Sequence, residues 1–148
     1  GCQLVASCDL AMASNTVKFA TPGVNLGLFC STPMVALSRN VSRKHAMEML
    51  LSGDMVDASR AEQIGLINRA FNPDQLTSET MAMALKIASK STMTIAIGKR
   101  AFYEQAEMPL NEAYAYTSQV MTENMLTWDA EEGIGAFLGK RTPEWQDQ

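Results

Sequence analysis

The sequence contains no run of about 18 consecutive apolar residues, so it predicts no membrane-spanning helix. It also lacks internal repeats and low-complexity stretches, which argues against a repeat architecture or a flexible linker. Of its 148 residues, 47% are hydrophobic and 19% are charged, a balance typical of a globular chain. We therefore expect a single domain with a buried core.

The chain also has little excess charge of either sign. Its formal net charge is −4 at pH 7, which argues against nucleic acid or an anionic membrane surface as a partner. A ligand that carries phosphate would have to be held by individual Lys or Arg side chains, or by helix N-termini.

The sequence offers few residues for metal binding or thiol chemistry. Its single histidine, His45, follows two basic residues, which indicates a solvated basic face rather than a ligand set. The cysteines are odd in number and match no metal-site spacing; they are Cys2, Cys8 and Cys30. We expect reduced, buried thiols and no metal site.

The first 33 residues have the pattern of a pocket wall in an α/β protein. An apolar run from Leu4 to Ala11 indicates a helix, and residues 17–20 indicate a short buried strand. Residues 21–33 hold two prolines and two glycines, which favours a loop with at most one short extended piece. A helix, a strand and a loop of small residues often build one wall of a pocket, although the pattern taken alone favours an ordinary core segment.

The rest of the chain is predicted to be mainly helical. Apolar stripes predict helices over about 33–40, 43–51, 58–64, 76–89, 93–102, 110–121 and 130–138, with a short strand over 66–71. The expected N-caps are Ser31 or Thr32, Ser42, Asp57 and Asp129. Gly53 and Gly65 are suited to the turns that end two of these helices.

Several segments together carry a resemblance to a known family. They are Gly1-Cys2-Gln3-Leu4, Cys8-Asp9, Phe19-Ala20-Thr21-Pro22-Gly23, Ala46–Asp54, Ala58–Leu66 and Glu131–Arg141. In their order and spacing the whole chain resembles the crotonase (enoyl-CoA hydratase/isomerase) family. The resemblance implies an α/β crotonase-like fold, the ClpP/crotonase spiral fold.

Family members are roughly twice as long, so the resemblance implies that this chain corresponds to their C-terminal half. We expect residues 1–72 to form the C-terminal part of the crotonase core, with the pocket wall and a small sheet remnant. Residues 73–148 are expected to form a helical region that covers the pocket and mediates oligomerisation, within one continuous fold. Taken alone, the chain is expected to expose apolar faces and to be poorly soluble.

The resemblance also implies where catalytic carboxylates would stand. Hydratases of this family place two glutamates on either side of a water, one acting as base and one as acid. Carried over residue by residue, these positions fall on Gln3 and Gly23. An amide does not exchange protons near pH 7 and glycine offers only its backbone, so this pair does not support ordinary hydratase chemistry. No catalytic residue is therefore assigned.

The family's shared device is an oxyanion hole, in which two backbone N–H groups stabilise the enolate of a CoA thioester. The resemblance places one donor at the residue just before Gly1 and the second donor in the N-terminal half of the family's fold. Gly1 and Cys2 would then flank the hole. The residues it implies for binding substrate or CoA are Gly1, Cys2, Gln3, Gly23, Cys30, Ser31, Phe137 and Lys140.

Three functions follow from the resemblance. The first is an acyl-CoA enzyme of fatty-acid and lipid metabolism, with the CoA thioester as substrate and no separate cofactor. The second is a non-catalytic acyl-CoA binder with a regulatory role, and the third is a helical oligomerisation piece without a ligand. The family also implies a homo-oligomer, either a trimer or a dimer of trimers, and a mitochondrial location.

Overall fold

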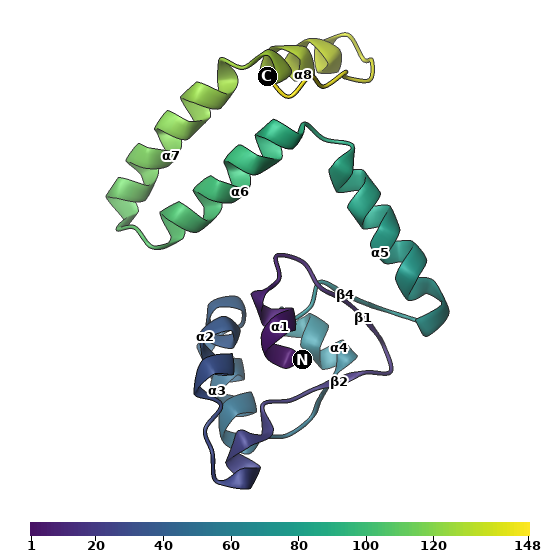
Figure 1. Cartoon of the computed structure of the whole chain (residues 1–148), viewed down its shortest axis with the longest axis vertical. Helices are drawn as coiled ribbons and strands as arrows, with labels where there is room; N and C mark the ends of the chain where they lie inside the picture. The colour runs from purple at the N-terminus through teal and green to yellow at the C-terminus, as the bar shows by residue number, and fades with distance from the viewer. The chain divides into compact units, whose positions relative to one another are not determined.

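Short strands interleaved with helices make up the first part of the chain, and helices alone make up the second, in a computed structural model that describes residues 1–148 (Figure 1). The first part contains α1 Cys2–Ser7, β1 Met12–Ser14, β2 Lys18–Phe19, the 3₁₀-helix η1 Pro22–Leu26, α2 Ser31–Asn40, α3 Arg43–Ser52, β3 Val56–Asp57, α4 Ala58–Gln63 and β4 Arg69–Phe71. The second contains α5 Pro73–Ala88, α6 Thr92–Ala106, α7 Leu110–Met125 and α8 Trp128–Leu138. None of these helices has the length and apolar character needed to span a membrane.

The chain divides into two compact units, 1–82 and 83–148, and the division falls within α5. In the first unit β1 pairs with β4 in parallel, and β2 pairs with β3 in antiparallel fashion. Asn68 fixes the start of the parallel pair, because its side-chain oxygen accepts the N–H of Ala11 at 2.7 Å while its own N–H donates to the Ala11 carbonyl at 2.8 Å.

Strand β1 was not predicted, and β4 is shorter than the predicted strand over 66–71. The N–H groups of Leu66 and Ile67 both donate to the carbonyl of Ala61 and so close the end of α4. These two residues are buried in that turn and are therefore not available for a strand.

The core of the first unit is built from small and medium-sized apolar side chains of its helices and strands. Its buried members are Ala6, Ala13, Phe19, Leu37, Val41, Ala46, Met49, Leu50, Ala58, Ala61, Ile64, Leu66 and Ile67. Helix α1 packs on α2 next to this core, and Asn40 joins the two helices by donating to the carbonyls of Ala6 and Ala36 at 2.7 and 2.9 Å.

Some of the predicted helix ends are confirmed. Asp57 caps α4 by accepting the N–H of Arg60 at 2.8 Å, and Ser42 occupies the N-cap position of α3 without a side-chain hydrogen bond. Gly53 and Gly65 have φ values of +66° and +81°, the left-handed conformation that favours glycine.

Other local predictions were wrong. Residues 21–33 are not loop throughout, because η1 forms there, with Gly27 as its C-cap. The N-cap of α2 is Cys30 rather than Ser31 or Thr32, since the Cys30 carbonyl already accepts the N–H of Met34. The three cysteines are free thiols, but Cys8 is exposed at the end of α1, so the expectation of buried thiols was also wrong.

In the second unit the N-cap of α8 is Thr127, not the predicted Asp129. The Thr127 hydroxyl accepts the N–H of Ala130, whereas Asp129 is only 2% exposed and receives the N–H groups of Gln146 and Asp147 at 2.8 and 3.2 Å. Burial alone would raise the pKa of Asp129, but hydrogen bonds from the Ser91 hydroxyl and these two amides outweigh it and lower that pKa.

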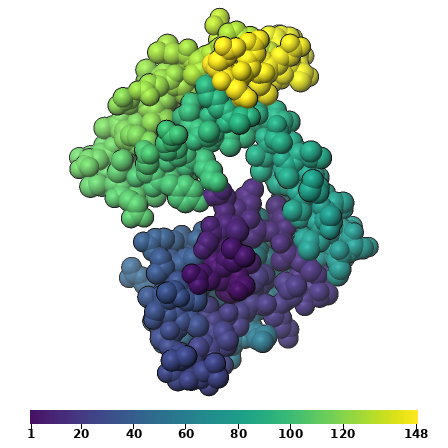
Figure 2. All heavy atoms as spheres, viewed as in Figure 1, coloured from purple at the N-terminus to yellow at the C-terminus, as the bar shows by residue number.

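Residues 142–148 form a C-terminal tail that folds back within the second unit (yellow in Figure 2). The Trp145 ring lies over Gly133, where an added Cβ would come within 3.3 Å of it, and its indole N–H donates to the Ser89 carbonyl at 2.9 Å. One carboxylate oxygen of Asp147 accepts the N–H groups of Thr92 and Met93, at the first turn of α6. The tail therefore ties α8 to the beginning of α6.

We predict that Thr127→Ala lowers the free energy of unfolding by about 1 kcal/mol, the usual cost of losing an N-cap side chain. Thr127→Ser keeps the hydroxyl that accepts the Ala130 N–H and should remain close to wild type. Both variants can be measured by thermal or urea unfolding. Equal stability of the Ala and Ser variants would contradict the assignment of Thr127 as the cap.

Candidate functional site

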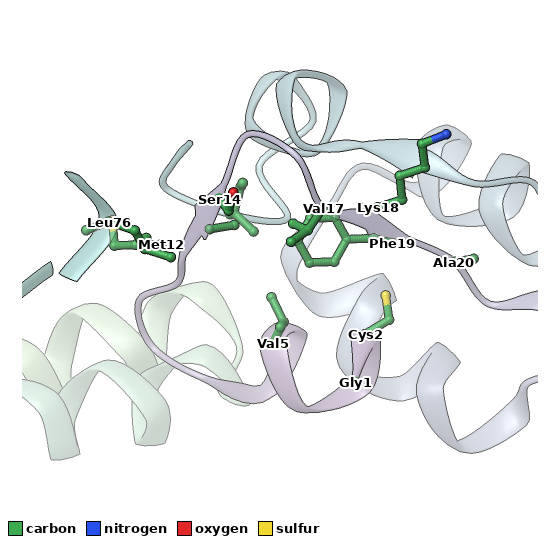
Figure 3. A pocket seen from close by; sticks show the side chains of 12 residues that line it. Gly1, Cys2, Val5, Met12, Ser14, Val17, Lys18, Phe19, Ala20 and Leu76 are labelled. Atoms are coloured by element: carbon green, nitrogen blue, oxygen red, sulfur yellow. The ribbon is translucent and has the colours of Figure 1, made fainter. Parts of the chain in front are cut away.

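An open, mainly apolar pocket of about 490 Å³ lies in the first unit, between α1, the strands β1 and β2, and the beginning of α5 (Figure 3). Its lining consists of Gly1, Cys2, Val5, Met12, Ala13, Ser14, Val17, Lys18, Phe19, Ala20, Ile67 and Leu76. Cys2 and Val5 point from α1 towards Val17 and Phe19, whereas the amino group of Lys18 points away from the other lining side chains.

The beginning of α1 forms one border of this pocket. Gly1 is the N-cap and provides no side chain, so no capping side chain accepts a hydrogen bond from the backbone amides of the first turn. Burial raises the pKa of the Cys2 thiol, and the nearby Cys30 adds a smaller increase. The Cys2 thiol is therefore protonated at neutral pH. It forms a weakly polar part of the pocket wall and is not an activated nucleophile.

Gly23 and Cys30 are in contact within the segment that connects β2 with α2. The Gly23 N–H donates to the Cys30 sulfur at 3.3 Å, and the Gly23 carbonyl accepts the N–H of Leu28 at 2.9 Å. A Cβ added at Gly23 would lie 2.8 Å from both the Cys30 Sγ and the Leu28 carbonyl oxygen. Position 23 therefore has no room for a side chain unless the backbone moves.

The remaining candidates of the first unit lie outside the pocket lining. Gln3 is exposed on α1, and its carbonyl accepts the Ser7 hydroxyl at 2.8 Å. Ser31 is exposed in the first turn of α2 and donates weakly to the Phe29 carbonyl, at 3.4 Å. Of the six candidates in this unit, Gly1 and Cys2 thus line the pocket and Cys30 supports Gly23. Their roles in binding stay predictions.

Phe137 and Lys140 belong to the second unit, where a single turn brings them together at the end of α8. The Lys140 N–H donates to the Phe137 carbonyl at 3.2 Å, and the Arg141 N–H donates to the Ala136 carbonyl at 3.0 Å. This pair of bonds is a Schellman motif, with Lys140 at the left-handed position, φ +51°. Phe137 is 82% exposed, so the turn presents an aromatic ring and a cation together.

Next to this turn lies an ion pair that the sequence did not predict. Arg141 holds both carboxylate oxygens of Glu132, with Nη1–Oε1 at 2.5 Å and Nη2–Oε2 at 2.7 Å. Hydrogen bonds from Arg141, and then from the Glu144 N–H, lower the pKa of Glu132 to about 2. The opposite charges within the Glu131–Arg141 segment were the only sequence signal for this pair.

No three His, Cys, Asp or Glu side chains come together as metal ligands in the chain. The polar side chains that line the pocket are the Cys2 thiol, the Ser14 hydroxyl and Lys18, whose amino group points away from the other lining side chains.

The whole chain, residues 1–148, matches the family model described as enoyl-CoA hydratase/isomerase. It is 52% identical over 145 residues to the mouse protein named enoyl-CoA hydratase domain-containing protein 3, mitochondrial, covering 98% of this chain and 48% of that protein. It is 51% identical over 148 residues to the human protein of that name, covering 100% of this chain and 49% of the human protein. The chain thus spans about half the length of these curated relatives.

Solved structures give the same likeness. The crystal structure of an enoyl-CoA hydratase from Mycobacterium smegmatis matches with a TM-score of 0.94 at 52% identity, covering 98% of this chain and 56% of that one. The human enoyl-CoA hydratase domain-containing protein 3 matches with a TM-score of 0.92 at 52% identity, covering 97% and 57%. The expected crotonase-like α/β fold is therefore confirmed.

We predict that Gly23→Ala lowers the free energy of unfolding by about 1–3 kcal/mol, because the new methyl group meets a backbone oxygen as well as the Cys30 sulfur. Gly98→Ala is a suitable control, since a Cβ there meets nothing within 4 Å and alanine favours the interior of α6. Urea unfolding of both variants measures the difference. A Gly23→Ala protein as stable as wild type would show that the loop yields easily.

The Glu132–Arg141 pair predicts a dependence of stability on pH. The pKa of Glu132 is depressed from 4.5 to about 2 in the folded chain, so its stabilisation is complete above pH 4.5 and is lost as the pH falls towards 2. Glu132→Gln should remove this part of the acid sensitivity. Thermal unfolding between pH 2 and pH 7 tests the prediction, and identical acid profiles for both proteins would contradict it.

Proposed function

The chain belongs to the enoyl-CoA hydratase/isomerase family, and from this premise we propose that it is part of an acyl-CoA-handling protein of fatty-acid metabolism. The protein would bind an acyl-CoA thioester and stabilise its enolate through backbone N–H groups. The proposal is supported by the family match over all 148 residues, together with the apolar pocket that Gly1 and Cys2 line at the beginning of α1. The thioester is itself the substrate or ligand, and no separate cofactor is proposed.

The pocket supplies one wall of the proposed acyl site. Its side chains are mainly apolar, which suits the hydrocarbon part of an acyl group, and the uncapped first turn of α1 borders it. Oxyanion stabilisation by backbone donors does not depend on side-chain identity, so the absence of carboxylates at Gln3 and Gly23 leaves it intact. In the longer relatives further chain accompanies the matched part, and we infer that the site is shared with it.

The turn at the end of α8 supplies the proposed contact to the CoA moiety. Phe137 offers an exposed aromatic surface, and the Lys140 ammonium offers a point charge for a phosphate group. The proposal also includes a homo-oligomer, a trimer or a dimer of trimers, and a mitochondrial location. The location is supported by the names of the mouse and human relatives, both of which include the word mitochondrial.

A second candidate, a non-catalytic acyl-CoA binder with a regulatory role, is favoured by the geometry at Gly23. A carboxylate at that position would need a Cβ 2.8 Å from the Leu28 carbonyl oxygen, so the loop is shaped against any side chain there. Gln3, at the other position, is an amide that cannot act as acid or base near pH 7. If the protein is an enzyme, its proton transfer therefore uses a different group.

Turnover of acyl-CoA thioesters by the natural full-length protein that contains these 148 residues is the direct test. The purified protein is incubated with enoyl-CoA and other acyl-CoA thioesters, the products are weighed by mass spectrometry, and binding is measured by calorimetry. We expect saturable binding together with a product of altered mass; a gain of water would identify a hydratase. Binding without turnover would establish the second candidate, and neither binding nor turnover would overturn both.

Gln3→Glu sharpens this test, because it places a carboxylate on an exposed position of α1 without crowding the loop at Gly23. Gln3 lies outside the pocket lining, so we expect the variant to raise hydration above the wild-type level only if Gln3 faces the acyl ligand in the natural full-length protein. Gln63→Glu makes the same charge change at the end of α4 and is the matched control. An equal effect of the two variants would remove Gln3 from the proposed site.

A further inference from the structure

The backbone conformation of Lys140 is unusual for its residue type. Only Lys140 and Asp147 have positive φ among the non-glycine residues of the chain. The left-handed position of a Schellman motif usually belongs to glycine, because a Cβ there is strained. Gly139 precedes Lys140 directly, yet it has a φ of −79° and leaves the strained position to the lysine. A lysine at such a strained position is a reason to look for a role of its side chain.

Glu132 and Arg141 hold the backbone on the C-terminal side of Lys140. Only 11% of the Glu132 side chain is exposed, and both of its carboxylate oxygens bind Arg141. Oxygen Oε1 also accepts the N–H of Glu144 at 2.9 Å, which ties the beginning of the tail to the same carboxylate. A two-point fork of this kind fixes orientation as well as distance, and lysine in place of Arg141 could not reproduce it.

The same pair determines which cation of the turn is available. The charge of Arg141 is compensated by Glu132, whereas the Lys140 ammonium has no ion-pair or hydrogen-bond partner in the chain. An anionic ligand that reaches this turn therefore meets Lys140 as the available charge, held in one backbone conformation by its neighbours.

We propose that Glu132 and Arg141 are positioning residues that hold Lys140 in its left-handed conformation and aim its ammonium at the phosphate groups of CoA. The inference rests on the proposed function, because CoA is the ligand assigned there to this turn. Neither Glu132 nor Arg141 need touch the ligand; they act through the backbone between Phe137 and Glu144.

The test is a double-mutant cycle in the natural full-length protein, with CoA affinity measured by calorimetry. We expect Lys140→Ala and Arg141→Gln each to weaken CoA binding by about tenfold, within the range of coupling found between contacting groups. The double variant should bind no more weakly than Lys140→Ala alone, because a positioning residue has no effect once the positioned group is gone. Lys86→Ala removes an exposed lysine from the last turn of α5 and serves as the charge control.

Two further variants separate positioning from a merely structural role. Lys140→Gly relieves the strained conformation, so it should raise the melting temperature while weakening CoA binding. Lys140→Arg retains the charge and should recover most of the affinity lost in Lys140→Ala. Should Arg141→Gln fail to fold, Glu132→Gln removes the same ion pair from the other side.

The outcomes distinguish this inference from the proposed function. Additive losses in the double variant, or unchanged CoA affinity in Arg141→Gln, would overturn the positioning role while leaving CoA binding in place. Wild-type protein that does not bind CoA would overturn the proposed function, and the positioning role with it. Matching affinity losses in Lys140→Ala and Lys86→Ala would show that the charge acts only at long range.

Discussion

The parallel pairing of β1 with β4 is the constraint on which the first unit depends. It joins segments 57 residues apart, from Met12↔Arg69 to Ser14↔Phe71, and Asn15 extends it through a hydrogen bond to Asn72 at 2.7 Å. Because β1 follows α1 and β4 leads into α5, this short pair brings the ends of those helices to a common place. Met12 of β1 and Leu76 of α5 both line the pocket, and Figure 3 shows their side chains next to one another.

What the sequence predicted well is what depends on neighbours along the chain. Gly53, Gly65 and the Asp57 cap follow from local rules that hold within four residues, and the structure has each of them. The fold class followed from motifs in register across the chain, since such motifs carry the fold of a whole family. Strand β1 escaped prediction because its three residues are stabilised by a partner strand that no local pattern indicates.

The candidate site also combines features that the sequence predicts with features that depend on tertiary contacts. Gly1, Cys2 and Lys140 could be named from motifs, but the closed space at Gly23 depends on how Leu28 and Cys30 fold back on it. Steric room is a property of the loop in three dimensions, and an alignment of residue types cannot give it. In the sequence, glycine in place of a glutamate at position 23 looks like a simple loss of function. In the structure, the loop around Gly23 is packed so closely that it leaves no room for a side chain.

The C-terminal tail has a consequence for how the second unit opens. Its last residues supply the amides that satisfy the buried carboxylate of Asp129, and the Gln148 carbonyl accepts the N–H of Asp129 at 3.0 Å. Release of residues 142–148 from α8 would remove the two amide donors and leave that buried carboxylate with the Ser91 hydroxyl, a costly state that favours local unfolding. The tail and the beginning of α8 are therefore expected to open together rather than one after the other.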